Sequence, residues 1–396
     1  MRKNVLMLIT ILAASINSMA FDDVKVSGFA TVAGGYISDE TVGATAANLP
    51  DPTTNKDDSS YDGHDGYNQE NVQFQPDSVA ALQISARIAE DVSMTIQMIG
   101  RFEDDEAEVN LEWAYINYDF SESSTIQVGR FRPSLYLLSN TLDVGYTYLW
   151  ITPPSEVYGG APISYADGAN LLMNHTFEND VTIEAAAFYA NVNQDLAISG
   201  QILPTNFHYM AGMDASISND YFKLRAGYMK TEISMDTAVF DPIVTGLSET
   251  DGLKIEKAEG SFASVGLSVD VADIILTGEY VVRNVKDTLL VEDTTAYYGT
   301  LGYRMGDFTP HVTYSVLENE YNESDTDPTI LFVRSGQAVD SETITAGLRY
   351  EVNARTALKL EYQSVDKSPL QLNALGDLEY ETTDAELYKI ALSVIF

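Results

Sequence analysis

Residues 125–169 read TIQVGRFRPSLYLLSNTLDVGYTYLWITPPSEVYGGAPISYADGA, and this stretch changes character soon after it begins. It opens as an alternating strand in which Ile126 and Val128 share one side. The alternation stops at Pro133, and the residues that follow contain no lysine or arginine and many Tyr, Trp, Pro and Gly. A loop of this length is usually functional or disordered, and its aromatic content argues against disorder. We therefore predict a loop that folds into a cavity built by the rest of the chain.

The composition of the whole chain narrows the class of protein. The 396 residues include no cysteine, and 59 acids stand against 22 bases. Disulfides and thiolate metal sites are thereby excluded, and the strong acidity argues against nucleic acid as a partner. No apolar run after the N-terminus is long enough for a membrane-spanning helix. The mean hydropathy of −0.09 fits a soluble protein and also a barrel that is polar inside and apolar outside.

The first twenty residues have the pattern of a secretory signal peptide. Arg2 and Lys3 precede an apolar core over 5–16, and Ser18 and Ala20 supply small residues before a cleavage site. We predict a signal peptide over 1–20 and a mature barrel domain over 21–396. Removing the two basic residues leaves 20 bases against 59 acids, a net charge of −39.

Sixteen segments of the mature chain alternate between apolar and polar residues. Each has about the length that a tilted strand needs to cross a bilayer, and an even number suits a closed antiparallel barrel. The predicted strands are 24–37, 79–89, 93–101, 111–120, 124–131, 169–178, 181–192, 207–218, 221–232, 261–271, 274–285, 295–305, 308–317, 342–352, 356–365 and 385–396.

The connections between these segments alternate between short and long. The short ones carry Asn, Asp, Ser and Gly, which turns favour, as at 90–91 and 179–180. The long ones are 38–78, 102–110, 132–168, 193–206, 233–260, 286–294, 318–341 and 366–384. This asymmetry is typical of outer-membrane barrels, with short periplasmic turns and long external loops. A solenoid or propeller would show an internal repeat, and we find none.

The last strand predicts which face meets lipid. Tyr388, Ile390 and Leu392 share one face with the final residue Phe396, which we interpret as an assembly signal, and polar residues share the other. Charged residues cost little in an aqueous lumen and a few kcal/mol on the lipid face. A β-sandwich also alternates, but sixteen segments and the loop asymmetry favour a barrel with an aqueous channel. The polar faces predict a basic lumen wall of Arg225, Arg283, Arg304, Arg349, Lys359 and Lys389.

The long aromatic segment resembles the third loop of the trimeric Gram-negative general porins. The resemblance rests on Gly129-Arg130, on 142–147 with its Gly-Tyr-Thr, and on 156–160 with its Glu-Val-Tyr-Gly-Gly. In that family a strand ends in Gly-Arg and a Pro-Glu-Phe-Gly-Gly turn closes the loop inside the pore. The segment is also the third external loop here. The resemblance implies a 16-stranded transmembrane β-barrel in the outer membrane, a homotrimer, and passive diffusion of small hydrophilic solutes.

The resemblance also implies a pore constriction with bases on the wall and acids on the loop. Arg130 matches the wall arginine, which the strand's end or a bulge must turn inward, and Glu156 matches the loop acid. Asp143 stands in for the family's second loop acid, and Arg132 begins the loop. Arg87 and Arg101, on the second and third strands, replace wall arginines that do not line up. Rings of charge of this kind tune ion preference, and the acidic approach to the pore favours cations.

Alternative functions remain open from the sequence. The aromatic loop could select sugars or anions, or it could pack against the wall, and the external loops could act as an adhesin or receptor. No Gly-x-Ser-x-Gly, His-Glu-x-x-His or P-loop motif occurs, so we expect no enzyme. A lipase on the lipid face would need a pair such as His175 and Ser216.

The partners expected are outer-membrane lipid and lipopolysaccharide, and no cofactor is expected. Oxygen-rich clusters such as Asp57, Asp58, Asp62 and Asp65, or the run 103–106, could hold Ca²⁺ or Mg²⁺. Their spacing does not match an EF-hand, and a solvated acidic surface is the simpler interpretation.

Overall fold

The computed structural model describes residues 22–40, 67, 71–103, 106–161, 163–198, 201–237, 255–286, 288, 291–320, 339–372, 378–380 and 383–396. The predicted signal peptide and the acidic cluster at 57–65 lie outside these residues. In the described part no helix is both long and apolar enough to span a membrane.

The described chain is almost entirely β-strand. The strands are β1 (Asp22–Glu40), β2 (Val79–Ala89), β3 (Val92–Glu103), β4 (Glu106–Ser121), β5 (Ser124–Phe131), β6 (Ala166–Thr176), β7 (Thr182–Ile198), β8 (Gln201–Ser218), β9 (Phe222–Met235), β10 (Ile255–Val271), β11 (Ile274–Val285), β12 (Asp293–Tyr303), β13 (Phe308–Glu320), β14 (Val339–Asn353), β15 (Thr356–Leu372), β16 (Leu378–Tyr380) and β17 (Thr383–Ile395).

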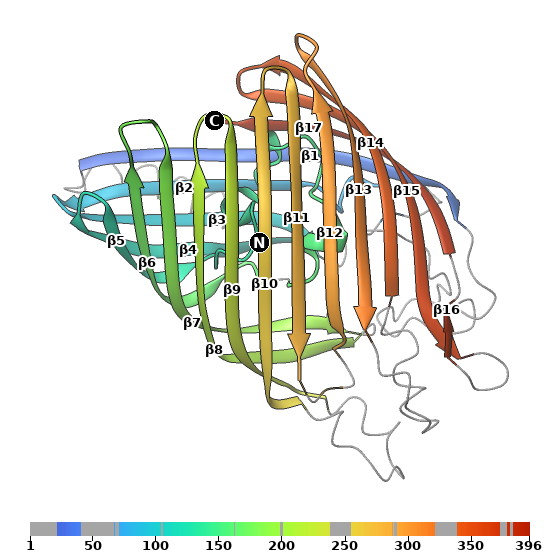
Figure 1. Ribbon diagram of the computed structural model, residues 1–396, viewed down its shortest axis with the longest axis horizontal. Helices are drawn as coiled ribbons and strands as arrows, with labels where there is room; N and C mark the ends of the chain where they lie inside the picture. The colour runs from blue at the N-terminus through green and yellow to red at the C-terminus, as the bar shows by residue number, and fades with distance from the viewer. Residues whose placement is uncertain are drawn as a thin grey trace.

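Sixteen of these strands close into one antiparallel ring, which confirms the predicted barrel. Each strand from β1 to β15 pairs with its neighbour in sequence, β15 pairs with β17, and β17 pairs with β1. The seventeenth, β16, is a three-residue extension that pairs only with the end of β15. Figure 1 shows β9 to β15 along the near wall and β1 to β5 crossing behind them. Closure leaves no unpaired sheet edge within the ring, which a bilayer requires.

Side chains alternate between the outside and the inside of this ring as predicted. On β17 the outward Tyr388, Ile390 and Leu392 are 48%, 45% and 43% exposed, whereas the intervening Lys389 and Ala391 are buried. The backbone N–H groups of Gly28 and Phe396 each donate to the other residue's carbonyl oxygen, so the two ends of the chain close the seam. We call the end with the tight connections the short-turn end and the opposite end the long-loop end.

Several strands run further toward the long-loop end than the alternation predicts. β4 begins at Glu106 rather than 111, β7 reaches Ile198 rather than 192, and β8 begins at Gln201 rather than 207. The predictions of loops at 102–110 and 193–206 are therefore wrong. Beyond the bilayer both faces of a hairpin can meet water, so backbone pairing continues after the apolar and polar residues have ceased to alternate.

The segment between β5 and β6 contains three short helical turns. They are η3 (Ser139–Thr141), η4 (Gly145–Thr147) and α2 (Ser155–Tyr158). The segment contacts inward-facing side chains of strands on both sides of the ring, including β3, β4, β9, β11, β13, β15 and β17. It thus crosses the inside of the barrel, and we call residues 132–165 the inner loop.

Candidate functional site

Most bases of the predicted lumen wall hold the inner loop by its backbone. They lie on inward faces and donate to loop carbonyl oxygens, so these carbonyls are paired although little water reaches them. The contacts are Arg225 with Ser134 and Leu135, Arg283 with Gly160 (2.7 Å), Arg349 with Tyr146 (2.6 Å) and Tyr148 (2.7 Å), and Lys359 with Gly145 and Trp150. These side chains anchor the loop instead of lining an open channel, which the sequence did not indicate.

Wall acids complete this anchoring by accepting from the loop. The Glu279 carboxylate accepts the Leu137 N–H and the Tyr158 hydroxyl, both at 2.7 Å. The Glu361 carboxylate accepts the Ile151 N–H at 2.6 Å. These short hydrogen bonds between buried groups fix the loop's position relative to β11 and β15.

Glu156 lies inside this anchored region. Its side chain is buried, and its oxygens accept from the hydroxyls of Ser315 (2.9 Å), Ser341 (3.2 Å) and Thr343. The prediction that Glu156 is an open acid at the constriction is corrected, because α2 packs it against β13 and β14. Its carboxylate fastens the loop instead of facing the passage.

Four aromatic residues of the inner loop are packing residues. Tyr136, Tyr148, Trp150 and Tyr158 are each at most 8% exposed, and burial raises the pKa of all three tyrosines. The Trp150 indole donates to the Thr313 hydroxyl at 2.7 Å. These rings belong to an apolar cluster that also includes inward residues of β7 to β12. Of the two roles left open for the loop aromatics, the structure therefore favours packing over a sugar-binding surface.

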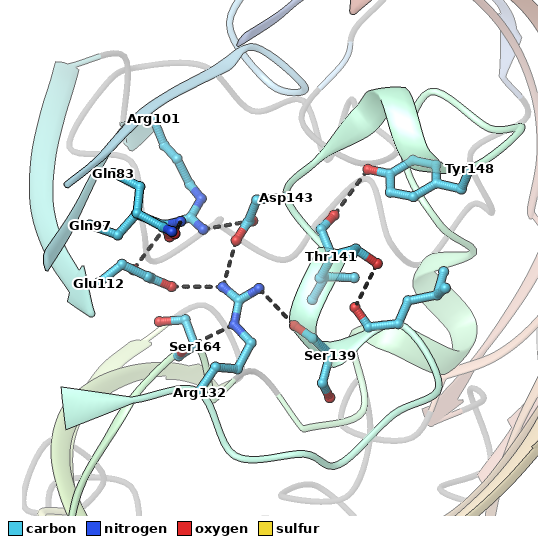
Figure 2. Close-up of polar contacts among 12 residues, drawn as sticks. Gln83, Gln97, Arg101, Glu112, Arg132, Ser139, Thr141, Asp143, Tyr148 and Ser164 are labelled. Atoms are coloured by element: carbon cyan, nitrogen blue, oxygen red, sulfur yellow. Dashed lines mark hydrogen bonds and ion pairs between the residues drawn. The ribbon is translucent and has the colours of Figure 1, made fainter. Parts of the chain in front are cut away.

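On the other side of the lumen, four charged side chains form a closed ionic cluster. Figure 2 shows Arg101 of β3, Glu112 of β4, and Arg132 and Asp143 of the inner loop pointing toward one another. Arg132 reaches Glu112 at 2.7 Å and Asp143 at 2.6 Å, and Arg101 reaches Asp143 at 2.7 Å and Glu112 at 3.6 Å. Two bases and two acids balance one another. We call these four residues the ionic cluster.

The loop carboxylate of the ionic cluster stays charged at neutral pH. Burial opposes ionisation of Asp143, but the Arg132 and Arg101 guanidinium groups outweigh it and hold the pKa of this carboxyl below its usual value. Arg132 also donates to the carbonyl oxygens of Ser139 (3.3 Å) and Ser164 (3.0 Å), which joins the two ends of the loop. The cluster therefore fixes the loop as well as carrying charge.

Glu112 is a member of the ionic cluster that the sequence analysis missed. The ladder pairs Gln97 with Trp113 and Met98 with Leu111, so Glu112 is the extra residue of a β-bulge. A bulge of this kind directs two successive side chains to one face. The sequence carries a trace of it, because the outward apolar residues shift from odd to even positions between Leu111 and Ile116.

Arg130 does not join the ionic cluster, so its predicted inward turn is wrong. The ladder pairs it with Ala114 and Asp167, on the same face as the exposed Val128. Its guanidinium binds the Asp167 carboxylate at 2.8 and 2.9 Å and lies over the Tyr165 ring at 4.0 Å. Gly129, with φ at +132°, does not reverse the alternation at this strand end.

The remaining predicted bases lie away from the ionic cluster. Arg87 is exposed beside the 90–91 turn and reaches Asp23 at 3.8 Å, and Arg304 pairs with Asp270 at the same short-turn end. The predicted role of Arg87 at the constriction is corrected by its position, and the place of Arg304 on the lumen wall stays a prediction. Lys389 is buried, with Asp77 at 3.3 Å and the loop's Thr152 at 3.3 Å. It therefore belongs with the bases that hold the loop.

Two cavities meet at the ionic cluster. The outer cavity, of about 910 Å³, lies toward the long-loop end and is lined by Arg101, Glu112, Arg130 and Tyr165 together with the ends of β7 and β8. The inner cavity, of about 420 Å³, lies toward the short-turn end and is lined by Arg132, by the start of the inner loop and by β4 to β9. Because Arg132 binds Glu112 directly, the ionic cluster stands between the two spaces. The described residues hold no group of His, Asp or Glu placed to bind a metal ion.

Comparisons with known proteins agree with this architecture. A family model described as Gram-negative porin matches residues 6–369. No curated protein matches the sequence. Similar solved structures include Salmonella typhi OmpF in complex with daunomycin (14% identity, TM-score 0.57, covering 94% of this chain and 97% of that chain) and an anion-selective porin from Comamonas acidovorans (10%, 0.56, 94% and 99%). A trimer form of the Vibrio cholerae outer membrane protein OmpT is similar too (12%, 0.55, 94% and 99%).

Proposed function

Because the chain belongs to the Gram-negative porins, and is thus an outer-membrane channel for passive diffusion of small solutes, we propose that its passage narrows at the ionic cluster of Arg101, Glu112, Arg132 and Asp143. The observation that carries this proposal is the position of the cluster between the outer and inner cavities. Because the cluster has no net charge, it does not exclude ions of either sign. An apolar solute is disfavoured, because it would displace the water that hydrates these charged side chains without replacing its hydrogen bonds.

Ion preference then follows from charge outside the cluster. The chain as a whole carries −37, whereas the cluster itself is neutral. We expect a modest preference for cations that weakens as salt rises, since charges further away than about 8–10 Å are screened at physiological ionic strength. The preference for anions that the Comamonas neighbour's name records is not expected here.

Planar-bilayer recording tests the proposal directly. Wild-type protein should give stepwise, ohmic openings, and the reversal potential in a KCl gradient should show the cation preference. Replacing Arg101 with Gln should change single-channel conductance and reversal potential together. Glu112 and Asp143 then face one base, Arg132, and the cluster beside the outer cavity gains a net negative charge. A bilayer that stays silent contradicts the channel, and an unchanged Arg101→Gln channel contradicts the site.

We also propose the assembly and maturation that the sequence predicts. Residues 1–20 would be removed on export, and 21–396 would assemble as a homotrimer in contact with lipid and lipopolysaccharide. The trimer form of the similar Vibrio cholerae protein supports the oligomer. Native mass spectrometry of detergent-extracted protein should give three copies, each lacking 1–20. The family and the fold are those of a channel, and we propose no catalytic role and only weak binding of Ca²⁺ or Mg²⁺ by the external acids.

A further inference from the structure

Two aromatic rings of the barrel wall lie half-buried beside the inner cavity. Trp113 and Tyr115 of β4 both line the inner cavity and are half-buried, with their ring centroids 6.4 Å apart and their planes tilted by 40°. The inner loop contributes Tyr136 to the same lining, but this ring is buried. A solute in the inner cavity therefore meets aromatic faces on β4.

The same cavity wall carries polar atoms that have no partner. Among the described residues, the Trp113 indole N–H, the Asn170 side-chain oxygen and one Asp214 carboxylate oxygen are buried without a hydrogen bond, and all three residues line the inner cavity. A buried polar atom that lacks a partner costs about 1–3 kcal/mol. One donor and two acceptors without partners, on three residues that line one cavity, are a reason to expect a ligand that can both donate and accept.

The charges around the inner cavity are already paired with one another. Lys223 binds Glu184 at 2.7 Å, and Arg225 lies 3.3 Å from Asp214. Arg132 is balanced within the ionic cluster. An incoming ion would have to break one of these pairs, whereas a neutral solute would leave them intact, so the lining favours a ligand without net charge.

We propose that the inner cavity binds a neutral, ring-shaped, hydroxyl-rich solute, that is, a small saccharide. Its hydroxyls would donate to Asn170 and Asp214 and accept from the indole N–H, while the C–H face of its ring would lie against Trp113 or Tyr115. The volume of about 420 Å³ is within the range of about 300–1,000 Å³ for small-molecule sites. The inference deepens the proposed channel function, because the saccharide would pause on its route past the ionic cluster.

The chain's two tryptophans give a direct readout. In the Trp150→Phe variant, Trp113 is the remaining tryptophan, and its fluorescence is titrated with maltose in the detergent-extracted full chain. We expect a saturable change in emission, which glycerol at equal osmolality does not produce. Adding Asn170→Leu should weaken the apparent affinity about fivefold to tenfold, the equivalent of one lost hydrogen bond. The matched control is Gln83→Leu, an inward amide outside the cavity, which should leave the affinity unchanged.

Two results overturn the inference. One is the absence of a saturable change in a Trp150→Phe protein that still runs as a heat-modifiable barrel, and the other is an affinity unaltered by Asn170→Leu. If Trp150→Phe does not fold, the maltose-induced change in wild-type emission should disappear in Trp113→Phe, and its persistence there also overturns the site. Conductance of the same preparations is recorded in parallel. Normal conductance without maltose binding contradicts only the saccharide site, whereas a silent bilayer contradicts the channel itself.

Discussion

The two sides of the lumen use the same residue types for different purposes. Along β9 to β17, Arg225, Arg349 and Lys359 are buried and donate to backbone carbonyl oxygens of the inner loop. Along β3 and β4, Arg101 faces carboxylates beside two cavities and keeps 27% of its side chain exposed. A lumen-facing base is therefore not by itself evidence of a charged passage. What it contacts decides whether it anchors the loop or acts on solutes.

The largest effect is expected on the anchoring side. Lys359→Met leaves the carbonyls of Gly145 and Trp150 without their buried donor, and each buried acceptor left unsatisfied costs about 1–3 kcal/mol. The midpoint of heat modification on gels should fall markedly, and single-channel conductance should rise as the loop moves from the wall.

The matched control for that change is Lys286→Met, because Lys286 and its partner Glu259 are 68% and 71% exposed. Solvent and salt screen an exposed pair of this kind, so stability and conductance should stay close to wild type. Equal effects of the two substitutions would contradict the distinction between anchoring and exposed bases.

A second effect is expected at the ionic cluster itself. Asp143→Asn removes the loop carboxylate between Arg101 and Arg132 and leaves two bases facing Glu112 alone. Hydrogen bonds to charged groups contribute about 1.5–3 kcal/mol, and the added positive charge should move the reversal potential toward anions. A variant with unchanged selectivity would place the narrowest point elsewhere.

The same carboxylate predicts a pH window. The folded-state pKa of Asp143 is depressed, so its contribution to stability is present above the ordinary aspartate pKa of about 3.9 and is lost as pH falls through the lower folded value. The contribution of Asp143 to selectivity should therefore persist as pH falls to about 4 and be lost below it. A transition near neutral pH would show that another group controls the passage.

The smallest effect is expected at Arg130. Its partner Asp167 is 48% exposed, so Arg130→Ala should cost about 1 kcal/mol or less. Arg130 lines the outer cavity but is not a member of the ionic cluster, so the reversal potential should shift only slightly. The comparison is with Arg101→Ala, which removes a member of the ionic cluster and should alter both conductance and selectivity. If Arg130→Ala had the stronger effect on selectivity, the assignment of Arg130 to the outer face would be wrong.

The barrel was predictable because alternation is local and repeats sixteen times. The pattern of Tyr388, Lys389, Ile390 and Ala391 already separates the lipid face from the lumen face, and each of the other segments shows the same alternation of apolar and polar residues. The site was harder, because strict alternation assigns Arg130 to the outer face and a family motif suggested otherwise. In the structure the alternation holds to Phe131, where β5 ends, and Arg132 reaches the ionic cluster because it lies in the inner loop beyond the strand.

What the sequence could not show is which charges meet. Glu112 reaches Arg132 through a bulge, and a bulge shifts the faces by one residue without any consistent sequence signal. The role of Lys359 depends on contacts with Gly145 and Trp150, more than 200 positions away. Such contacts depend on the position that the inner loop takes inside the closed barrel. A local sequence pattern does not determine that position.

The contacts of the inner loop also affect how the barrel resists deformation of its cross-section. A cylinder of paired strands resists stretching around its circumference, because that would break ladder hydrogen bonds, but it flattens readily into an ellipse. The segment 132–165 is tied to β3 and β4 on one side and to β9, β11, β13, β15 and β17 on the other. It works as an internal strut, and it lets the barrel keep its cross-section when the surrounding bilayer is compressed.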